Sequence, residues 1–355
     1  MKQHRIICIP TLTFALLLMF TPSILQAQDK PVFPIDSLIT VGYATGNKKN
    51  ISGSVEKITE LGMNKDQITN PLEAIRGRVP GLTIQKGTNG PAALDAVRLR
   101  GTTSLTSGND PLIIVDGVFG DLSMLTSIYP TDIESFTILK DASETAQYGS
   151  RGASGVIEIT TKKGIRGKTR VSYNGSFGIS SVYKNLEMLS GNEFRNLARQ
   201  QGVAILDKGN ETDFLKEIEQ TGLQQNHHVA FYGGTDASSY RVSLGFMDRQ
   251  GIILNEDMKN FTSNMNMTQH VFDDFLVCEL GMFGSIQKNH NLFDLQKTFY
   301  SAATFNPTYP NHRNSETDSW DQITNASQIT NPLAWMEVKD HDATSPVSYT
   351  HLTLP

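Results

Sequence analysis

Cysteines, long apolar runs and excess positive charge are all scarce in this sequence. Only two cysteines occur, and Cys8 lies in an N-terminal segment that we expect to be removed, which leaves Cys278. A single thiol excludes an intramolecular disulfide. After residue 27 no stretch reaches about 18 consecutive apolar residues, which excludes a protein of membrane-spanning helices. A membrane β-barrel is not excluded, because its strands alternate and keep mean hydropathy low.

Residues 1–27 are predicted to be an export signal peptide. Lys2 and Arg5 give a positive start, Ile6–Phe20 is mostly apolar, and Ala27 is a small residue at the expected cleavage position. Cleavage removes these two basic residues and shifts the formal net charge from −5 to −7. This mild acidity argues against nucleic acid as a partner, because phosphate recognition needs a basic face.

Residues 51–164 are predicted to form one compact α+β domain, joined to the signal by a polar linker over residues 28–50. Asn70 and Asp141 are good N-caps for short helices at 70–77 and 142–148, and Gly149 is expected to end the second helix in a left-handed conformation. Apolar, β-prone runs predict strands at 52–58, 82–84, 96–100, 111–117, 133–139 and 156–161.

No catalytic or metal-binding pattern emerges from the polar residues. The scattered carboxylates, such as Asp95, Asp110 and Asp121, fit turn and cap chemistry. The glycine-rich run 149–155 follows a helix, whereas a phosphate-binding loop precedes one. The adjacent His227 and His228 point to opposite faces of a strand, and we interpret the histidines as surface residues without ligand spacing. We therefore expect no enzyme, no cofactor and no metal site.

From residue 165 onward the pattern changes to long alternating strands. Five are expected, at 169–181, 227–232, 239–247, 260–271 and 275–287. In the third, one face is apolar and the other carries Arg241, Ser243 and Gly245, which is the alternation of a barrel strand between lipid and water. A soluble antiparallel sandwich is the alternative. Between the first two strands, 186–197 is expected to hold a helical stretch capped by Ser190 or Asn192. The aromatics of the long loops are assigned to loop packing, with sugar stacking as the alternative; they are Tyr300, Tyr309, Trp320 and Trp335.

Three stretches of the compact domain resemble the plug domain of TonB-dependent outer-membrane receptors of the SusC/RagA family. They are RLRGTTSL, PLIIVDGV and LKDASETAQYGSRGASGV, in the family's order and spacing. The resemblance marks as motif residues Arg98, Arg100, Gly101, Asp116, Gly117, Lys140, Asp141, Tyr148, Gly149, Arg151, Gly152 and Gly155. It implies an α+β plug domain followed by the first antiparallel strands of a transmembrane β-barrel, which has about 22 strands when complete.

The linker contains a segment similar to the family's TonB box, the strand that a periplasmic energy transducer grips. Its expected contact residues are Asp36, Ser37, Leu38, Ile39, Thr40 and Val41. Strand addition works through backbone pairing, so β-branched residues matter more than identity. The segment departs from the family pattern, with Leu38, Ile39 and Thr40 where valine is usual.

The resemblance also implies a function and a set of partners. The expected function is TonB-dependent import of an oligosaccharide or peptide across the outer membrane. The implied partners are a TonB-type energy transducer, a SusD-like surface lipoprotein and outer-membrane lipid. The alternatives are an exported binding or adhesion module without transport, or a truncated receptor without function. Residues 165–345 are expected to be only the start of a barrel, and 346–355 resemble a translated sequencing adapter.

Overall fold

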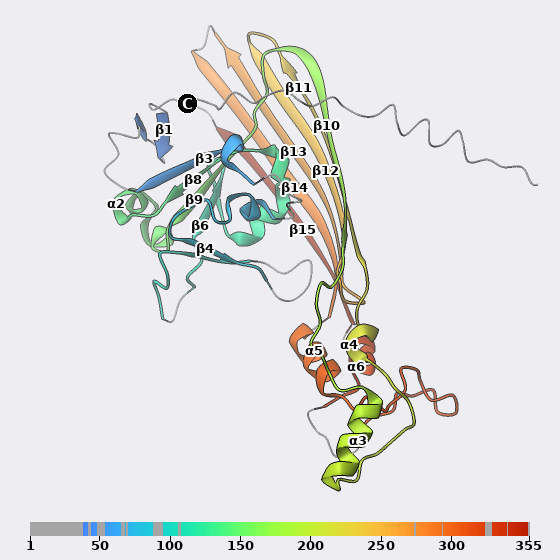
Figure 1. The fold of residues 1–355 in the computed structure, drawn as a ribbon. Coiled ribbons are helices and arrows are strands. Elements are labelled where there is room, and N and C mark those ends of the chain that lie inside the picture. Colours follow the sequence, from blue (N-terminus) through green and yellow to red (C-terminus); the bar gives the residue numbers. More distant parts are fainter. Residues whose placement is uncertain are drawn as a thin grey trace, which may run out of the picture.

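The computed structural model describes residues 38–41, 44–47, 54–64, 68, 70–87, 95–105, 108–272, 275–292, 294–323, 329–338 and 340–353. They form an N-terminal α/β domain, a long antiparallel sheet and a group of helices beyond one end of that sheet (Figure 1). The predicted signal peptide, with Asp36 and Ser37, lies outside the described residues. Within the described residues, no helix has both the length and the apolar character needed to cross a membrane.

The N-terminal domain is built on a five-stranded sheet with the order β3-β8-β9-β6-β7. Strands β6 and β9 are parallel, and the other neighbours are antiparallel. Its strands are β3 (Val55–Thr59), β6 (Leu112–Val115), β7 (Val118–Gly120), β8 (Ile133–Leu139) and β9 (Val156–Thr161), and β4 (Leu82–Gln85) and β5 (Ala96–Leu99) form a separate hairpin. Its short helices are η3 (Glu60–Gly62), η4 (Pro71–Ile75), η5 (Leu122–Ser127), η6 (Pro130–Asp132), α2 (Ala142–Thr145) and η7 (Ala146–Gly152).

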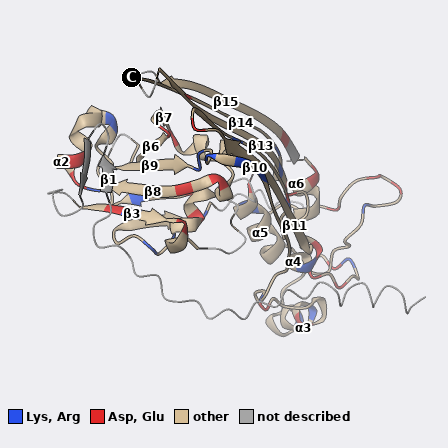
Figure 2. Ribbon diagram, turned by 90° about the horizontal axis from the view of Figure 1, so that it is seen from above, with Lys and Arg blue, Asp and Glu red and all other residues tan. Residues whose placement is uncertain are grey.

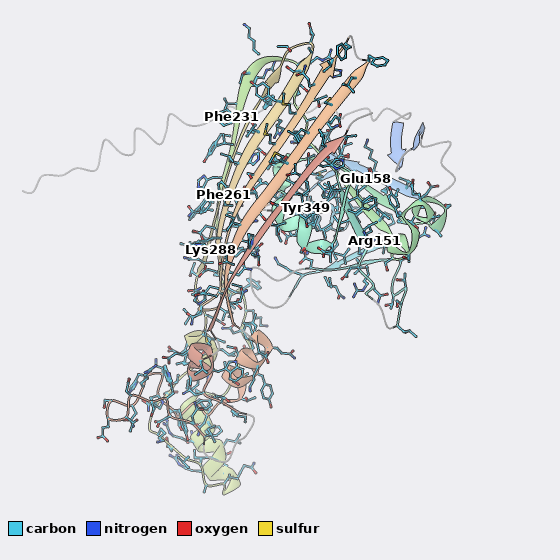
Figure 3. All side chains as sticks on the ribbon, turned by 180° about the vertical axis from the view of Figure 1, so that it is seen from behind. Arg151, Glu158, Phe231, Phe261, Lys288 and Tyr349 are labelled. Carbon is cyan, nitrogen blue, oxygen red and sulfur yellow. The ribbon has the colours of Figure 1, made fainter. Side chains whose placement is uncertain are left out.

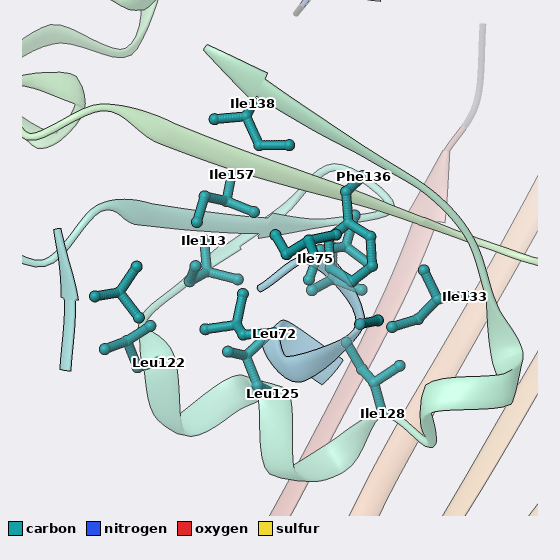
Figure 4. Close-up of a cluster of buried hydrophobic side chains, with 14 of the residues drawn as sticks. Leu72, Ile75, Ile113, Leu122, Leu125, Ile128, Ile133, Phe136, Ile138 and Ile157 are labelled. Atoms are coloured by element: carbon teal, nitrogen blue, oxygen red, sulfur yellow. The ribbon is translucent and has the colours of Figure 1, made fainter. Parts of the chain in front are cut away.

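The core of this domain lies between the sheet and the helices η4 and η5 (Figure 4). Ile75, Phe136 and Ile157 are wholly buried there. Each such side chain contributes about 1.5–3 kcal/mol through removal from water. The expected strands at 133–139 and 156–161 are confirmed with the same bounds, because both sit in this core and carry its apolar side chains.

The two predicted helices are largely 3₁₀ rather than α-helical. The first is the 3₁₀ helix η4, in which Asn70 and Glu73 form a capping box and Gly77 follows with φ 73°. The second is a single α-turn, α2, that continues as the 3₁₀ helix η7. Gly149 has φ 61° and ψ −146°, so it takes a glycine-specific conformation different from the predicted left-handed helical one.

The long sheet has six strands in sequential order, each antiparallel to its neighbours. They are β10 (Gly167–Ser180), β11 (Gly222–Gly234), β12 (Ser238–Gln250), β13 (Asp257–Val271), β14 (Leu276–Leu292) and β15 (Asp340–Thr353). The five predicted strands correspond to β10–β14, most of them longer than expected. The sixth, β15, was not predicted and contains most of the segment assigned to an adapter. An extended segment can pair beside an open strand edge whatever its origin, so the adapter assignment stays a prediction.

Polarity in this sheet is inverted relative to a soluble protein. The face turned away from the N-terminal domain exposes apolar side chains, namely Val171, Tyr173, Phe177, Ile179, Leu223, Phe231, Leu244, Phe246, Phe261, Met282 and Ile286. The face turned toward the domain buries polar ones, namely Gln224, Asn226, His228, Arg241, Ser243, Thr262, Asn264, Ser285 and Gln287. In Figure 3, Phe231 and Phe261 lie on the sheet, and Glu158 and Arg151 lie on the domain beside it. From above, the sheet curves round one side of the domain (Figure 2).

The connections at one end of the sheet pack into a small helical layer of their own. Its helices are α3 (Gly191–Gln201), α4 (Phe214–Glu217), α5 (Leu295–Thr304) and α6 (Pro332–Val338). Ser190 caps α3 in a capping box with Glu193, which confirms one of the two predicted caps. A second buried cluster holds the layer together and includes Phe214, Ile218, Phe305 and Tyr309. Tyr309 is therefore buried in this cluster, in agreement with its assignment to loop packing.

Candidate functional site: the contact between the N-terminal domain and the sheet

The predicted motif residues first build turns of the N-terminal domain. Asp116 and Gly117 form the two-residue turn between β6 and β7, with φ 46° and 86°. The Asp116 carboxylate accepts hydrogen bonds from the Thr161 amide (2.9 Å) and hydroxyl (2.5 Å), which ties this turn to the end of β9. Burial raises the pKa of Asp116 despite these hydrogen bonds.

Two arginines of the motif form ion pairs near the surface. Arg98 lies 2.5 Å from Asp110, and Arg100 pairs with Asp141. Asp141 occupies the N-cap position of α2 without capping it, because its side chain instead accepts from the Ser54 amide and Arg100. The Ser54 amide and the Arg100 guanidinium hold the pKa of Asp141 below its usual range. These pairs join the start of β3, the end of β5 and the start of α2.

The remaining motif residues position the segment between β8 and β9. Tyr148 packs edge-on against Phe119 at 6.0 Å, and Lys140 donates to the Pro80 carbonyl at 3.4 Å. A Cβ at Gly152 would lie 2.7 Å from the Thr145 carbonyl oxygen, and one at Gly155 would lie 2.5 Å from Cδ1 of Leu99. The other three are exposed: Gly101 follows β5, and Gly149 and Arg151 lie within η7. The motif thus forms a scaffold across the domain and does not converge on one ligand position.

The TonB-box-like segment is extended where the structure describes it. Leu38–Val41 forms strand β1, which pairs antiparallel with β2 (Ala44–Asn47). The role of the segment in contacting an energy transducer remains a prediction.

A cluster that sequence reasoning missed connects the domain to the polar face of the sheet. Asp132, at the end of η6, is 2% exposed. Its carboxylate lies 2.9 Å from a guanidinium nitrogen of Arg241 on β12 and 3.0 Å from Nε2 of His228 on β11. The Ser243 hydroxyl donates to its second oxygen at 2.5 Å. Burial alone raises the pKa of Asp132, but its three partners hold it below the usual range.

An aromatic ring and a carbonyl extend this contact. Tyr129 stacks on His228 with a centroid distance of 4.7 Å and lies against Met247 and Met258. Its ring takes the space beside Gly245, where an added Cβ would collide with Cδ2 of the tyrosine. The Asn260 amide of β13 donates to the Thr126 carbonyl at 2.8 Å. His228 is therefore a buried contact residue, and its interpretation as a surface histidine is wrong.

A second contact lies nearer the turns that join β11 to β12 and β13 to β14. Lys163 pairs with Glu279 of β14 at 2.9 Å, and both side chains are nearly half exposed. Asn266 of β13 donates to the Thr161 hydroxyl at 3.0 Å. A cavity of about 270 Å³ separates the domain from β13 and β14 here. A larger one of about 600 Å³ lies between the domain and β10 and β11. Among the described residues, no group of acidic, histidine or cysteine side chains has the arrangement of a metal site.

Comparisons with known proteins agree with this arrangement. The family profile described as "TonB-dependent Receptor Plug Domain" matches residues 47–156. The chain is 33% identical over 342 residues to "TonB-dependent receptor SusC" of Bacteroides thetaiotaomicron, covering 88% of this chain and 34% of that protein. It is 35% identical over 251 residues to "TonB-dependent receptor P3" of Formosa agariphila, covering 70% of this chain and 25% of that protein. The chain thus spans about a third or less of the length of these relatives.

Solved structures show the same architecture. The RagAB peptide importer in its "closed-closed" state matches 80% of this chain and 37% of that chain, with a TM-score of 0.68 and 26% identity. Its "open-open" state matches 90% of this chain and 40% of that chain, with a TM-score of 0.74 and 23% identity.

A mixed α/β domain seated on the polar face of a sheet with an apolar outer face defines the plug and the first barrel strands of a TonB-dependent receptor. Within that class, the chain belongs to the SusC/RagA family. The expected fold class is confirmed, and the soluble-sandwich alternative is wrong.

Proposed function

We propose that this chain is the N-terminal part of an importer that moves an oligosaccharide or a peptide across the outer membrane. The observation that carries the proposal is the seating of the plug against the polar, inward face of the barrel strands. A domain in that position closes the lumen, so passage requires that it shift. The relatives carry the names of receptors, and we propose no covalent chemistry for this protein.

The energy for this shift would arrive through Asp36–Val41. Strand addition needs an extended backbone, and Leu38–Val41 is already extended in β1. An energy transducer would replace β2 as the pairing partner and pull on the chain that leads into the plug.

On the outer side we propose that a SusD-like lipoprotein covers the mouth. The RagAB structures are described as a peptide importer with "open-open" and "closed-closed" states, which supports a lid for a protein of this architecture. The helical layer formed by α3–α6 lies beyond one end of the sheet (Figure 1), and we assign that end to the mouth. Placement in the outer membrane, after removal of residues 1–27, is part of the same proposal.

Deletion of Asp36–Val41 from the complete receptor tests the mechanism. Uptake of labelled oligosaccharide and peptide pools should fall to background, while binding of the same pools at the cell surface stays unchanged. An equally long deletion of Lys30–Ile35 is the control and should leave uptake intact. Uptake that survives loss of Asp36–Val41 would contradict the mechanism. Surface binding without uptake by the undeleted receptor would instead favour an exported binding module without transport.

A further inference from the structure

The plug holds the barrel wall through two contacts of unequal strength. We call Thr126–Asp132 the anchor segment and its binding site on β11, β12 and β13 the socket. Within this contact Asp132, His228 and Arg241 are all at least nine-tenths buried. The Lys163–Glu279 pair of the second contact is nearly half exposed on both sides. Separating a buried, hydrogen-bonded ion pair is far more costly than separating an exposed one.

The socket complements the anchor segment in shape as well as in charge. Gly245 leaves room for the ring of Tyr129, and any side chain there would collide with it. Asn260 holds the Thr126 carbonyl at one end of the segment, and Arg241 and Ser243 hold Asp132 at the other. The contact therefore resists both sliding and lifting.

The chain connects this contact directly to the plug sheet. The residue after Asp132 is Ile133, the first residue of β8. Strand β3 lies at the edge of the sheet and pairs with β8 alone among the described strands. It is also the first plug strand after β1, so a pull on Asp36–Val41 reaches β3 before any other plug strand. The strand that receives the force thus pairs with the strand that the anchor holds.

We propose that the anchor segment stays seated in its socket throughout transport, and that the pull separates β3 from the fixed strand β8. This inference rests on the proposed function and assigns positioning roles to Tyr129 and Asp132. The cavity of about 600 Å³ lies beside the parts that would separate. Its lining includes Glu60 and Met63, which follow β3, together with Tyr129 of the anchor segment and the inward-facing Asn174 and Asn226. Withdrawal of β3 widens this cavity into a path along β10 and β11.

Two reversible cross-links in the complete receptor test whether the anchor segment stays in its socket, and whether β3 must leave β8, during transport. The first is the double variant Tyr129→Cys with Gly245→Cys, the anchor pair. A Cβ at position 245 would lie 2.9 Å from Cγ of Tyr129, one bond from the tyrosine Cβ, so the two Cβ atoms lie no farther apart than the roughly 4.5 Å upper limit for a disulfide. The second is Thr59→Cys with Ser135→Cys, the strand pair, at positions that are direct partners across β3 and β8. The parent of both has its native cysteines, including Cys278, replaced by serine.

The expected results differ between the two disulfides. The oxidised anchor pair fixes the anchor segment in its socket, and uptake of labelled oligosaccharide and peptide pools by this variant should be the same before and after addition of a reductant. The oxidised strand pair should abolish uptake, keep surface binding, and allow uptake again on addition of a reductant. Loss of uptake in the oxidised anchor variant that a reductant reverses would overturn the inference, and so would normal uptake with β3 locked to β8. A parent that shows no transducer-dependent uptake would instead overturn the proposed function itself.

Discussion

At the scale of single residues, Gly155 shows why the plug motif needs glycine. Its φ is 91°, and an added Cβ would lie 2.5 Å from Cδ1 of Leu99 and 3.3 Å from the Leu139 carbonyl oxygen. Gly155→Ala therefore combines backbone strain with overpacking, which together cost on the order of 2–4 kcal/mol. The expected result is a lower urea midpoint for unfolding of the plug in the detergent-solubilised chain, with an unchanged slope.

Gly108→Ala is the matched control for this substitution. A Cβ at Gly108 meets no atom within 4 Å, and its φ lies outside the left-handed region. The urea midpoint of this variant should stay close to that of the parent chain. Equal midpoints for the two alanine variants would contradict the structural role of Gly155.

The Asp132 cluster shows which residue-level features the sequence can predict. The inward direction of His228, Arg241 and Ser243 follows from strand alternation, which is a local property. Their partner Asp132 lies 109 residues before Arg241 in the chain, and no local pattern connects the two. That the plug motif residues and Asp36–Val41 act in transport stays a prediction, because the contacts described here are structural.

At the scale of elements, the turn between β12 and β13 contains an unusual carboxylate. Glu256 is 3% exposed, and its Oε1 has no hydrogen-bond partner among the described residues. Burial raises the pKa of Glu256 from 4.5 to about 7. The turn around it is tied to the end of the first long connection, because the Gln220 side chain donates to the carbonyls of Gly251 and Ile253.

This raised pKa predicts a turn that loosens as pH rises. A carboxyl group whose pKa is higher in the folded state contributes its full stability below pH 4.5 and loses it as pH rises through 7. With allowance for solvent screening, the loss is on the order of 2 kcal/mol. Hydrogen exchange of the Gly251 amide, which donates to the Glu256 carbonyl, should quicken over this range after correction for intrinsic rates.

Glu256→Gln keeps the shape of the side chain and removes its titration. The corrected exchange rate of the Gly251 amide should then be nearly independent of pH between about 4.5 and 8, the range over which the parent carboxyl ionises. Glu187→Gln, at an exposed carboxylate of the first long connection, should retain the pH dependence of the parent. A parent chain without any such pH dependence would contradict the prediction.

Elements with local signals are those that the sequence predicts well. Strands β8 and β9 have the predicted bounds because apolar alternation and the flanking turn residues mark both ends. The first predicted helix shortens to the 3₁₀ helix η4, whose Pro71, Leu72, Ala74 and Ile75 are buried in the plug core. The helical layer is harder to predict, because its buried cluster brings together α4, α5 and α6 from separate connections.

At the scale of the whole molecule, both edges of the long sheet are open. Among the described residues, β10 and β15 each pair with a single neighbour. Each unpaired backbone group in hydrocarbon costs roughly several kcal/mol, so membrane sheets close into barrels. Plugged transporters of this kind have about 22 strands. This chain covers about a third of the SusC relative, and we expect the further barrel strands to be encoded in the part of the protein that this chain does not cover.

Reading the source DNA past the codon for Thr344 should therefore reveal a frame that continues through many more alternating strands. The protein expressed from that complete frame should migrate in SDS as a heat-modifiable band, because a closed barrel resists the detergent until it is boiled. The chain of 355 residues, expressed alone as the control, should migrate identically before and after boiling. A heat-modifiable band from the 355-residue chain itself would show that its strands close without further sequence, and would contradict the assignment of β10–β15 to part of a larger barrel.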